Sequence, residues 1–72
     1  MVSVFELSGI KVIMPTNTIK RLDVGKDSLG VKTLVINDIY GEKFAFVDDR
    51  IDDVVEDLIL EMEMCHTNPL WN

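Results

Sequence analysis

The side chains of this chain best suited to catalysis or metal binding are a cysteine, a histidine and several aspartates. Cys65 and His66 are adjacent, and each is the only residue of its kind. Neighbouring side chains of a helix do not face each other, so His66 is poorly placed to act as a base for Cys65. A zinc site needs four ligands, which this pair cannot supply. We therefore expect Cys65 to be a small, buried hydrophobic residue.

Two other patterns fall short of a phosphate or cation site. Gly25-Lys26 resembles the end of a phosphate-binding loop, but that loop needs a glycine where Lys20 stands and Ser or Thr where Asp27 stands. The pairs Asp48-Asp49 and Asp52-Asp53 lack the alternating acids and the glycine of an EF-hand loop. We therefore expect no metal, no cofactor and no enzyme activity, and an interaction protein is the favoured class.

The composition describes one small acidic domain. The 72 residues include 7 Lys and Arg against 13 Asp and Glu, for a net charge of −6, and 47% are hydrophobic, too many for a disordered chain. A domain of this size buries only about 60% of the surface that its unfolded chain exposes. Its stability would gain from oligomerisation, so we expect a homodimer.

Membrane insertion and secretion are not indicated. No apolar run approaches the length of a transmembrane helix, and the first residues lack the basic segment of a secretory signal. The single cysteine cannot form an internal disulfide, which is typical of a reducing compartment. The sequence therefore predicts a cytoplasmic protein.

The hydrophobic pattern predicts an α+β fold, a small antiparallel sheet of about four strands followed by one helix. Apolar and β-branched runs predict strands in residues 1–47, with Ser8-Gly9 as the first turn. Residues 19–24 alternate imperfectly and fit either a short strand or an extended segment. The predicted strands cover residues 2–7, 10–14, 31–36 and 43–47.

From residue 48 the apolar period changes from two to 3.6, which predicts an amphipathic helix in segment 48–66, from about residue 49 to about residue 65. Asp48 or Asp49 would cap its start, and Pro69 would keep the tail, residues 67–72, out of it. The residues of the expected core stripe share this spacing: Ile51, Val54, Val55, Leu58, Ile59 and Met62.

The charge of the chain is concentrated on this helix. Residues 48–64 contain eight acids and one base, a formal charge of −7, and the other residues sum to +1. At about 100° per residue the acids cover the outward face, and Leu60 and Met64 fall in its middle. The six acids of this face are Asp52, Asp53, Glu56, Asp57, Glu61 and Glu63.

This face has two interpretations. In the first, the acids are merely solvated. In the second, they bind a basic partner, which would explain a helix that accepts like charges one turn apart, each such pair costing a few tenths of a kcal/mol. Leu60, Met64 and Trp71 would make the dimer contact, although Trp71 could instead pack over the sheet.

The order of the motifs resembles that of the flagellar-operon FlbD-type small proteins over about residues 5–60. The similar segments are Phe5 to Met14, Ile19 to Leu22, Thr33 to Ile36, Tyr40 to Val47 and Ile51 to Val55. The resemblance implies a strand meander followed by an acidic helix, and little about function. The chain departs from it in its longer acidic helix and in its tail. In size and acidity it is also similar in kind to phage-encoded DNA mimics that inhibit histone-like nucleoid proteins.

The leading hypothesis is a small acidic homodimer, with a phage origin as one candidate source. It would occupy the DNA-binding surface of a basic nucleoid or transcription protein through the six acids, without binding nucleic acid or membrane itself. The alternative is a structural, assembly or regulatory subunit of FlbD-like type with no DNA-mimic role.

Overall fold

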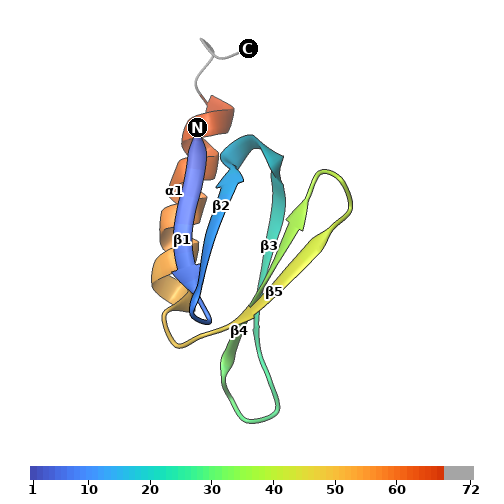
Figure 1. Ribbon diagram of the computed structural model, residues 1–72, viewed down its shortest axis with the longest axis vertical. Coiled ribbons are helices and arrows are strands. Elements are labelled where there is room, and N and C mark those ends of the chain that lie inside the picture. Colours follow the sequence, from blue (N-terminus) through green and yellow to red (C-terminus); the bar gives the residue numbers. More distant parts are fainter. Residues whose placement is uncertain (68–72) are drawn as a thin grey trace.

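The computed structural model describes residues 1–67, with side chains for residues 1–65. Five strands, one turn of 3-10 helix and one α-helix follow one another along the chain, and the helix lies against the first strand (Figure 1). The elements are β1 (Val2–Leu7), β2 (Ile10–Pro15), η1 (Thr16–Thr18), β3 (Ile19–Lys26), β4 (Lys32–Asp38), β5 (Lys43–Val47) and α1 (Ile51–Thr67).

The strands form two antiparallel sheets. The hairpin sheet contains β1 and β2, and the three-stranded sheet has the order β3-β4-β5. The hairpin sheet turns at Ser8 and Gly9, which both have positive φ values, 55° and 72°. Positive φ at both central residues matches the right-handed twist of the strands and sets Leu7 opposite Ile10.

The two turns of the three-stranded sheet repeat one design. Asp27 and Asp38 each accept, through Oδ1, the backbone N–H groups of the residues two and four positions later, at 2.8–3.0 Å. Three positions after each aspartate stands a glycine with positive φ, Gly30 at 81° and Gly41 at 84°. The pattern Asp-x-x-Gly-x therefore sets both turns, because aspartate satisfies the loop N–H groups and glycine adopts the left-handed conformation without strain.

The core lies where α1 meets both sheets. Ile51 and Leu58 of α1 are fully buried, with 0 and 1% exposure. Phe5 of β1 meets Phe46 of β5 edge to face, with ring centres 6.0 Å apart, and so bridges the two sheets. The remaining buried apolar side chains of the described residues are Leu7, Ile19, Leu34 and Ile36.

The α+β class and the C-terminal helix are confirmed. The structure adds detail to the single sheet of about four strands: residues 19–26 form a full strand, and the strands divide into two sheets. Ile59 was wrongly placed in the core, since it is 45% exposed at the margin of the apolar stripe. Cys65 is half-buried, with its Sγ 3.7 Å from Met1 Sδ.

Among residues 1–67, no helix combines the length and the apolar character needed to cross a membrane.

The shared turn design predicts that Gly30→Ala and Gly41→Ala each destabilise the fold by about 1 kcal/mol or more, because alanine is strained at positive φ. Thermal unfolding followed by circular dichroism should show a melting temperature lower by about 4–8 °C.

Gly25→Ala is the matched control. Its added Cβ would lie 3.5 Å from Thr33 Oγ1, an ordinary contact, and its φ is not positive. An equal fall in melting temperature for Gly25→Ala would contradict the conformational explanation.

Candidate protein-binding site

The acidic helix is anchored to the β1–β2 turn by Asp48. Its Oδ1 accepts the backbone N–H of Arg50 at 2.9 Å, and its Oδ2 accepts the backbone N–H of Ser8 at 2.9 Å. The Ser8 hydroxyl donates to the Val47 carbonyl at 2.8 Å. Asp48 thus lies at the junction before α1, as expected for a capping residue, but it bonds the N–H that precedes the first helical residue.

These bonds also determine the protonation of Asp48. The backbone N–H groups of Arg50 and Ser8, in that order of importance, hold the pKa of Asp48 well below its usual value of 3.8. The carboxylate therefore keeps its charge close to the N-terminus of α1, where the helix dipole favours a negative charge.

The structure places the predicted acids along the outer side of α1. Asp52, Asp53, Glu56 and Asp57 are exposed, as is Glu63, and Glu61 is half-buried. Asp52 forms an ion pair with Lys32 of β4. Within the part of the chain that the structure describes, four of these acids have no cationic partner: Asp53, Glu56, Asp57 and Glu61.

Two large apolar side chains lie among these acids. Leu60 is 55% exposed and Met64, one turn further on, is 58% exposed. Exposed apolar side chains surrounded by charge are a frequent feature of surfaces that bind another protein. Trp71, the third residue of the predicted dimer contact, lies outside the described residues.

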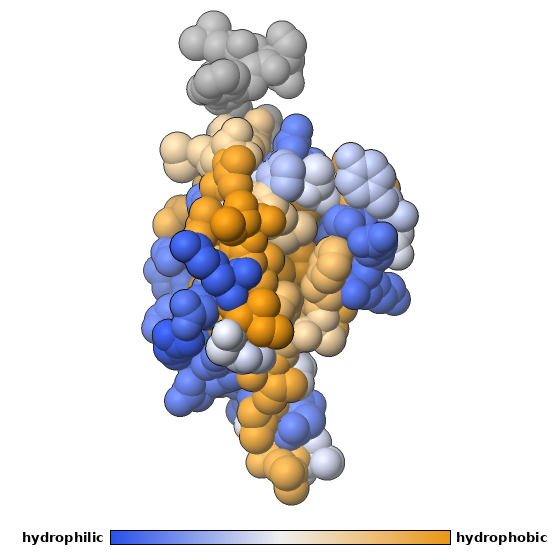
Figure 2. Space-filling view, viewed as in Figure 1, coloured by the Kyte–Doolittle hydropathy of each residue, from blue (hydrophilic) through white to orange (hydrophobic). Residues whose placement is uncertain are grey.

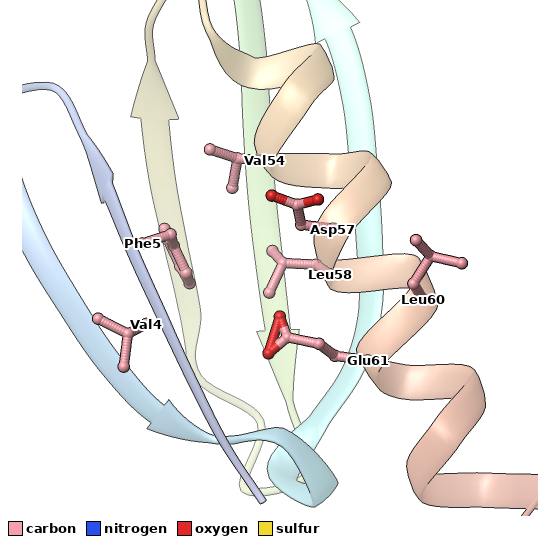
Figure 3. Close-up of a pocket in the computed structure, with 7 residues that line it drawn as sticks. All are labelled: Val4, Phe5, Val54, Asp57, Leu58, Leu60 and Glu61. Carbon is pink, nitrogen blue, oxygen red and sulfur yellow. The ribbon is translucent and has the colours of Figure 1, made fainter.

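A groove of about 260 Å³ separates α1 from β1. Phe5 and Leu58 lie between the helix and the strand, and the carboxylates of Asp57 and Glu61 project from α1 toward β1 (Figure 3). Its full lining is Val4, Phe5, Val54, Asp57, Leu58, Leu60 and Glu61. The groove thus combines an apolar floor with an acidic rim.

The outer face of the hairpin sheet continues this apolar surface. Val2, Val4 and Ile13 are each more than half exposed, and Val4 stands opposite Ile13. Figure 2 shows this face as a mostly hydrophobic area over β1 and β2, with hydrophilic groups across part of it. Lys11 and Glu6, a cross-strand pair of opposite charge, lie on the same face.

The arrangement is suited to binding. Among the described residues, no three Asp, Glu, His or Cys side chains come together as a metal site would require. The six predicted acids and the apolar pair Leu60 and Met64 all lie on α1, where Asp52 is directed to Lys32 of β4 while Asp57 and Glu61 line the groove beside β1. Sequence reasoning missed the strand side of the groove, Val4 and Phe5. The sequence of β1 carried a signal for it. Burial alternates along this strand, and apolar residues such as Val4 and Phe5 occur on both of its faces.

Comparison of the chain with protein families, curated proteins and solved structures gives no match, so no relative assigns a function.

The lowered pKa of Asp48 predicts an acid-dependent loss of stability. Because the folded-state pKa lies below the unfolded value, the unfolded chain binds more protons as the pH falls. The contribution of Asp48 is therefore complete above about pH 5 and declines as the pH falls below about 4. Asp48→Asn should lower the melting temperature at pH 7 and reduce its further decrease between pH 5 and pH 2.

Asp53→Asn provides the comparison, since Asp53 is exposed and has no cationic partner among the described residues. Melting curves at several pH values distinguish the two variants. If Asp48→Asn kept the wild-type decrease below pH 4, the hydrogen bonds to Asp48 would not be the cause.

Proposed function

We propose that this protein is a small acidic binding protein that occupies the DNA-binding surface of a basic nucleoid or transcription protein and so inhibits it. The observation that supports this proposal is a carboxylate cluster on α1, formed by the exposed Asp53, Glu56 and Asp57 and the half-buried Glu61, none of which has a cationic partner among the described residues. Such a cluster is complementary in charge to a basic DNA-binding groove.

The spacing of the acids supports the comparison with DNA. Asp53, Asp57 and Glu61 are four residues apart, so they form a row with a repeat of about 6 Å along the helix axis. A regular row of negative charges is also what a nucleic-acid backbone presents to its proteins. Within the isolated chain the row is unfavourable, because like charges at this spacing repel each other. A basic partner would relieve that repulsion.

Two further properties follow from the proposal. The binding should weaken steeply with salt, because exposed charges separated by more than about 8–10 Å are screened at physiological ionic strength. The protein would act by blocking a surface and would need no catalytic group. The partner class with the matching chemistry is a histone-like nucleoid protein, whose DNA-binding surface is basic.

The alternative function is that of an assembly or regulatory subunit of FlbD-like type, and the exposure of Leu60 and Met64 favours it. In that case the apolar pair would contact another protein or a second copy of this chain, and the acids would only be solvated. Salt distinguishes the two functions, since it weakens charge-driven binding and strengthens apolar contact between two acidic surfaces.

The acidic row is tested by the triple variant Asp53→Lys, Asp57→Lys and Glu61→Lys. We expect the wild-type protein to displace a fluorescent DNA duplex from a purified histone-like nucleoid protein at about 50 mM salt. The triple variant should lose this activity and remain folded, because reversing the row removes no core side chain. Fluorescence anisotropy measures the displacement, and circular dichroism checks the fold.

A matched pair of double variants separates position from net charge. Asp53→Lys with Asp57→Lys changes the charge of α1, and Glu6→Lys with Glu42→Lys makes the same change away from it. Only the first pair should impair displacement. Equal losses of displacement by the two double variants would indicate a general charge effect. Unchanged displacement by the triple variant would contradict the proposed function.

The homodimer is a separate proposal, with Leu60 and Met64 at its centre. Light scattering at tens of micromolar should give twice the mass of one chain. The fraction of dimer should rise with salt, because salt screens the repulsion between the two acidic helices of the dimer. Leu60→Lys with Met64→Lys should give monomers of unchanged fold, since both side chains are exposed. A wild-type monomer under these conditions would overturn the dimer.

A further inference from the structure

The groove beside β1 borders an unpaired strand edge. Leu7 and Ile10, which flank the two-residue turn, form a hydrogen-bonded pair. Along the ladder every second pair is of this kind, so Phe5 with Val12 and Ser3 with Met14 are also hydrogen-bonded pairs. The backbone groups of the intervening residues, Val2, Val4 and Glu6, therefore point away from β2. The Glu6 carbonyl accepts a bond from Arg50 Nη2 at 3.5 Å.

Val2 and Val4 have no such partner. β1 pairs with β2 alone, and neither valine joins the other backbone–backbone hydrogen bonds of residues 1–67. An edge of this kind is a template for a further strand. Proteins usually protect their edges with charge, proline or an overlying element. Val2 and Val4 carry neither charge nor proline, and α1 flanks the edge across the groove without a backbone hydrogen bond to either residue.

The side chains beside the edge indicate what that strand would contain. Val4, which is 54% exposed, and the half-buried Val54 offer an apolar surface, and Asp57 and Glu61 project beside it from α1 (Figure 3). A groove between a strand edge and a helix suits an extended segment whose alternate side chains enter the groove. The acidic rim favours lysine or arginine, whose aliphatic stems can pack on the floor while their charges reach the carboxylates.

We propose that the edge of β1 and the adjoining groove bind an extended peptide segment of the partner, one that alternates apolar and basic residues. The segment adds a strand beside β1 through the backbone groups of Val2 and Val4. Its apolar side chains contact Val4 and Val54, and its basic side chains contact Asp57 and Glu61. This inference deepens the proposed function and rests on it for the basic character of the partner.

The probe is a fluorescent synthetic peptide of eight residues that alternates leucine and lysine, titrated with the full chain and followed by anisotropy. Val4→Pro removes an outward N–H without breaking the β1–β2 ladder, since proline is tolerated at a strand edge. We expect it to weaken peptide binding about tenfold, the factor that 1.4 kcal/mol represents. Asp57→Asn with Glu61→Gln should weaken binding by a similar factor.

Each variant has a matched control. Ile13 is the cross-strand partner of Val4, so Ile13→Pro makes the same change at the opposite edge of the hairpin sheet. Asp23→Asn with Glu42→Gln removes two charges that lie outside α1 and away from the groove. Both controls should bind the peptide within about twofold of the wild type, well under the tenfold step of 1.4 kcal/mol. Equal weakening by the controls would overturn the inference.

A second measurement keeps the test independent of the folding of Val4→Pro. The same peptide with alternate backbone nitrogens methylated cannot pair with a strand edge, and it should bind the wild-type protein about tenfold more weakly. Equal binding of the methylated peptide would also overturn the inference. Light scattering is recorded in parallel, and a loss of self-association caused by Val4→Pro would assign the edge to a second copy instead.

The failure of this inference and the failure of the proposed function give different results. Normal displacement of DNA by Val4→Pro, together with unimpaired peptide binding, would overturn the groove proposal and leave the acidic row intact. Groove-dependent peptide binding by a protein that never displaces DNA would support the groove and overturn the proposed function.

Discussion

Ile51 and Leu58 of α1 join two sheets that share no hydrogen-bond ladder with each other. A two-stranded hairpin is marginally stable in water, so β1 and β2 depend on the helix that packs against them. Burying each of these side chains contributes about 1.5–3 kcal/mol, more than the like-charge pairs of α1 cost. The inward face of the helix therefore supplies the stability that lets its outward face be acidic.

The same arrangement leaves β1 exposed. If the hairpin sheet and the three-stranded sheet formed one continuous sheet, β1 could be covered by a neighbouring strand. Instead, Phe5 meets Phe46 across the core, and the Ser8–Asp48 bond ties the hairpin turn to the helix junction. These contacts hold β1 in place through its inner face and its turn. Its edge needs no further strand for stability, and the groove beside it stays open.

Local patterns in the sequence predicted the elements well. The change of period at residue 48 gave the helix, and turn residues such as Ser8-Gly9 separated the strands. Ile59 shows where periodicity fails, because a position at the margin of an apolar stripe is buried only if an element covers it. The acids could be placed on one helix face because that placement depends on local geometry alone.

The division into two sheets could not be predicted in the same way. Whether β2 pairs with β3 depends on the path of η1 and on contacts between distant residues, such as Phe5 with Phe46. The groove shares this dependence, since Val4 and Leu60 are far apart in the sequence and line it only after α1 has packed. The helix side of the candidate site could therefore be predicted from a helical wheel, and the strand side required the tertiary structure.

The acidic rim also bears on which strand the edge accepts. An open, apolar edge would ordinarily pair with any extended chain, including a second copy of itself. Such self-pairing would bring two rims, each with Asp57 and Glu61, to the same pair of strands, and the like charges would oppose it. The carboxylates of Asp57 and Glu61 would attract a basic segment and repel a second copy of this chain. The charge that destabilises the helix therefore makes the edge selective.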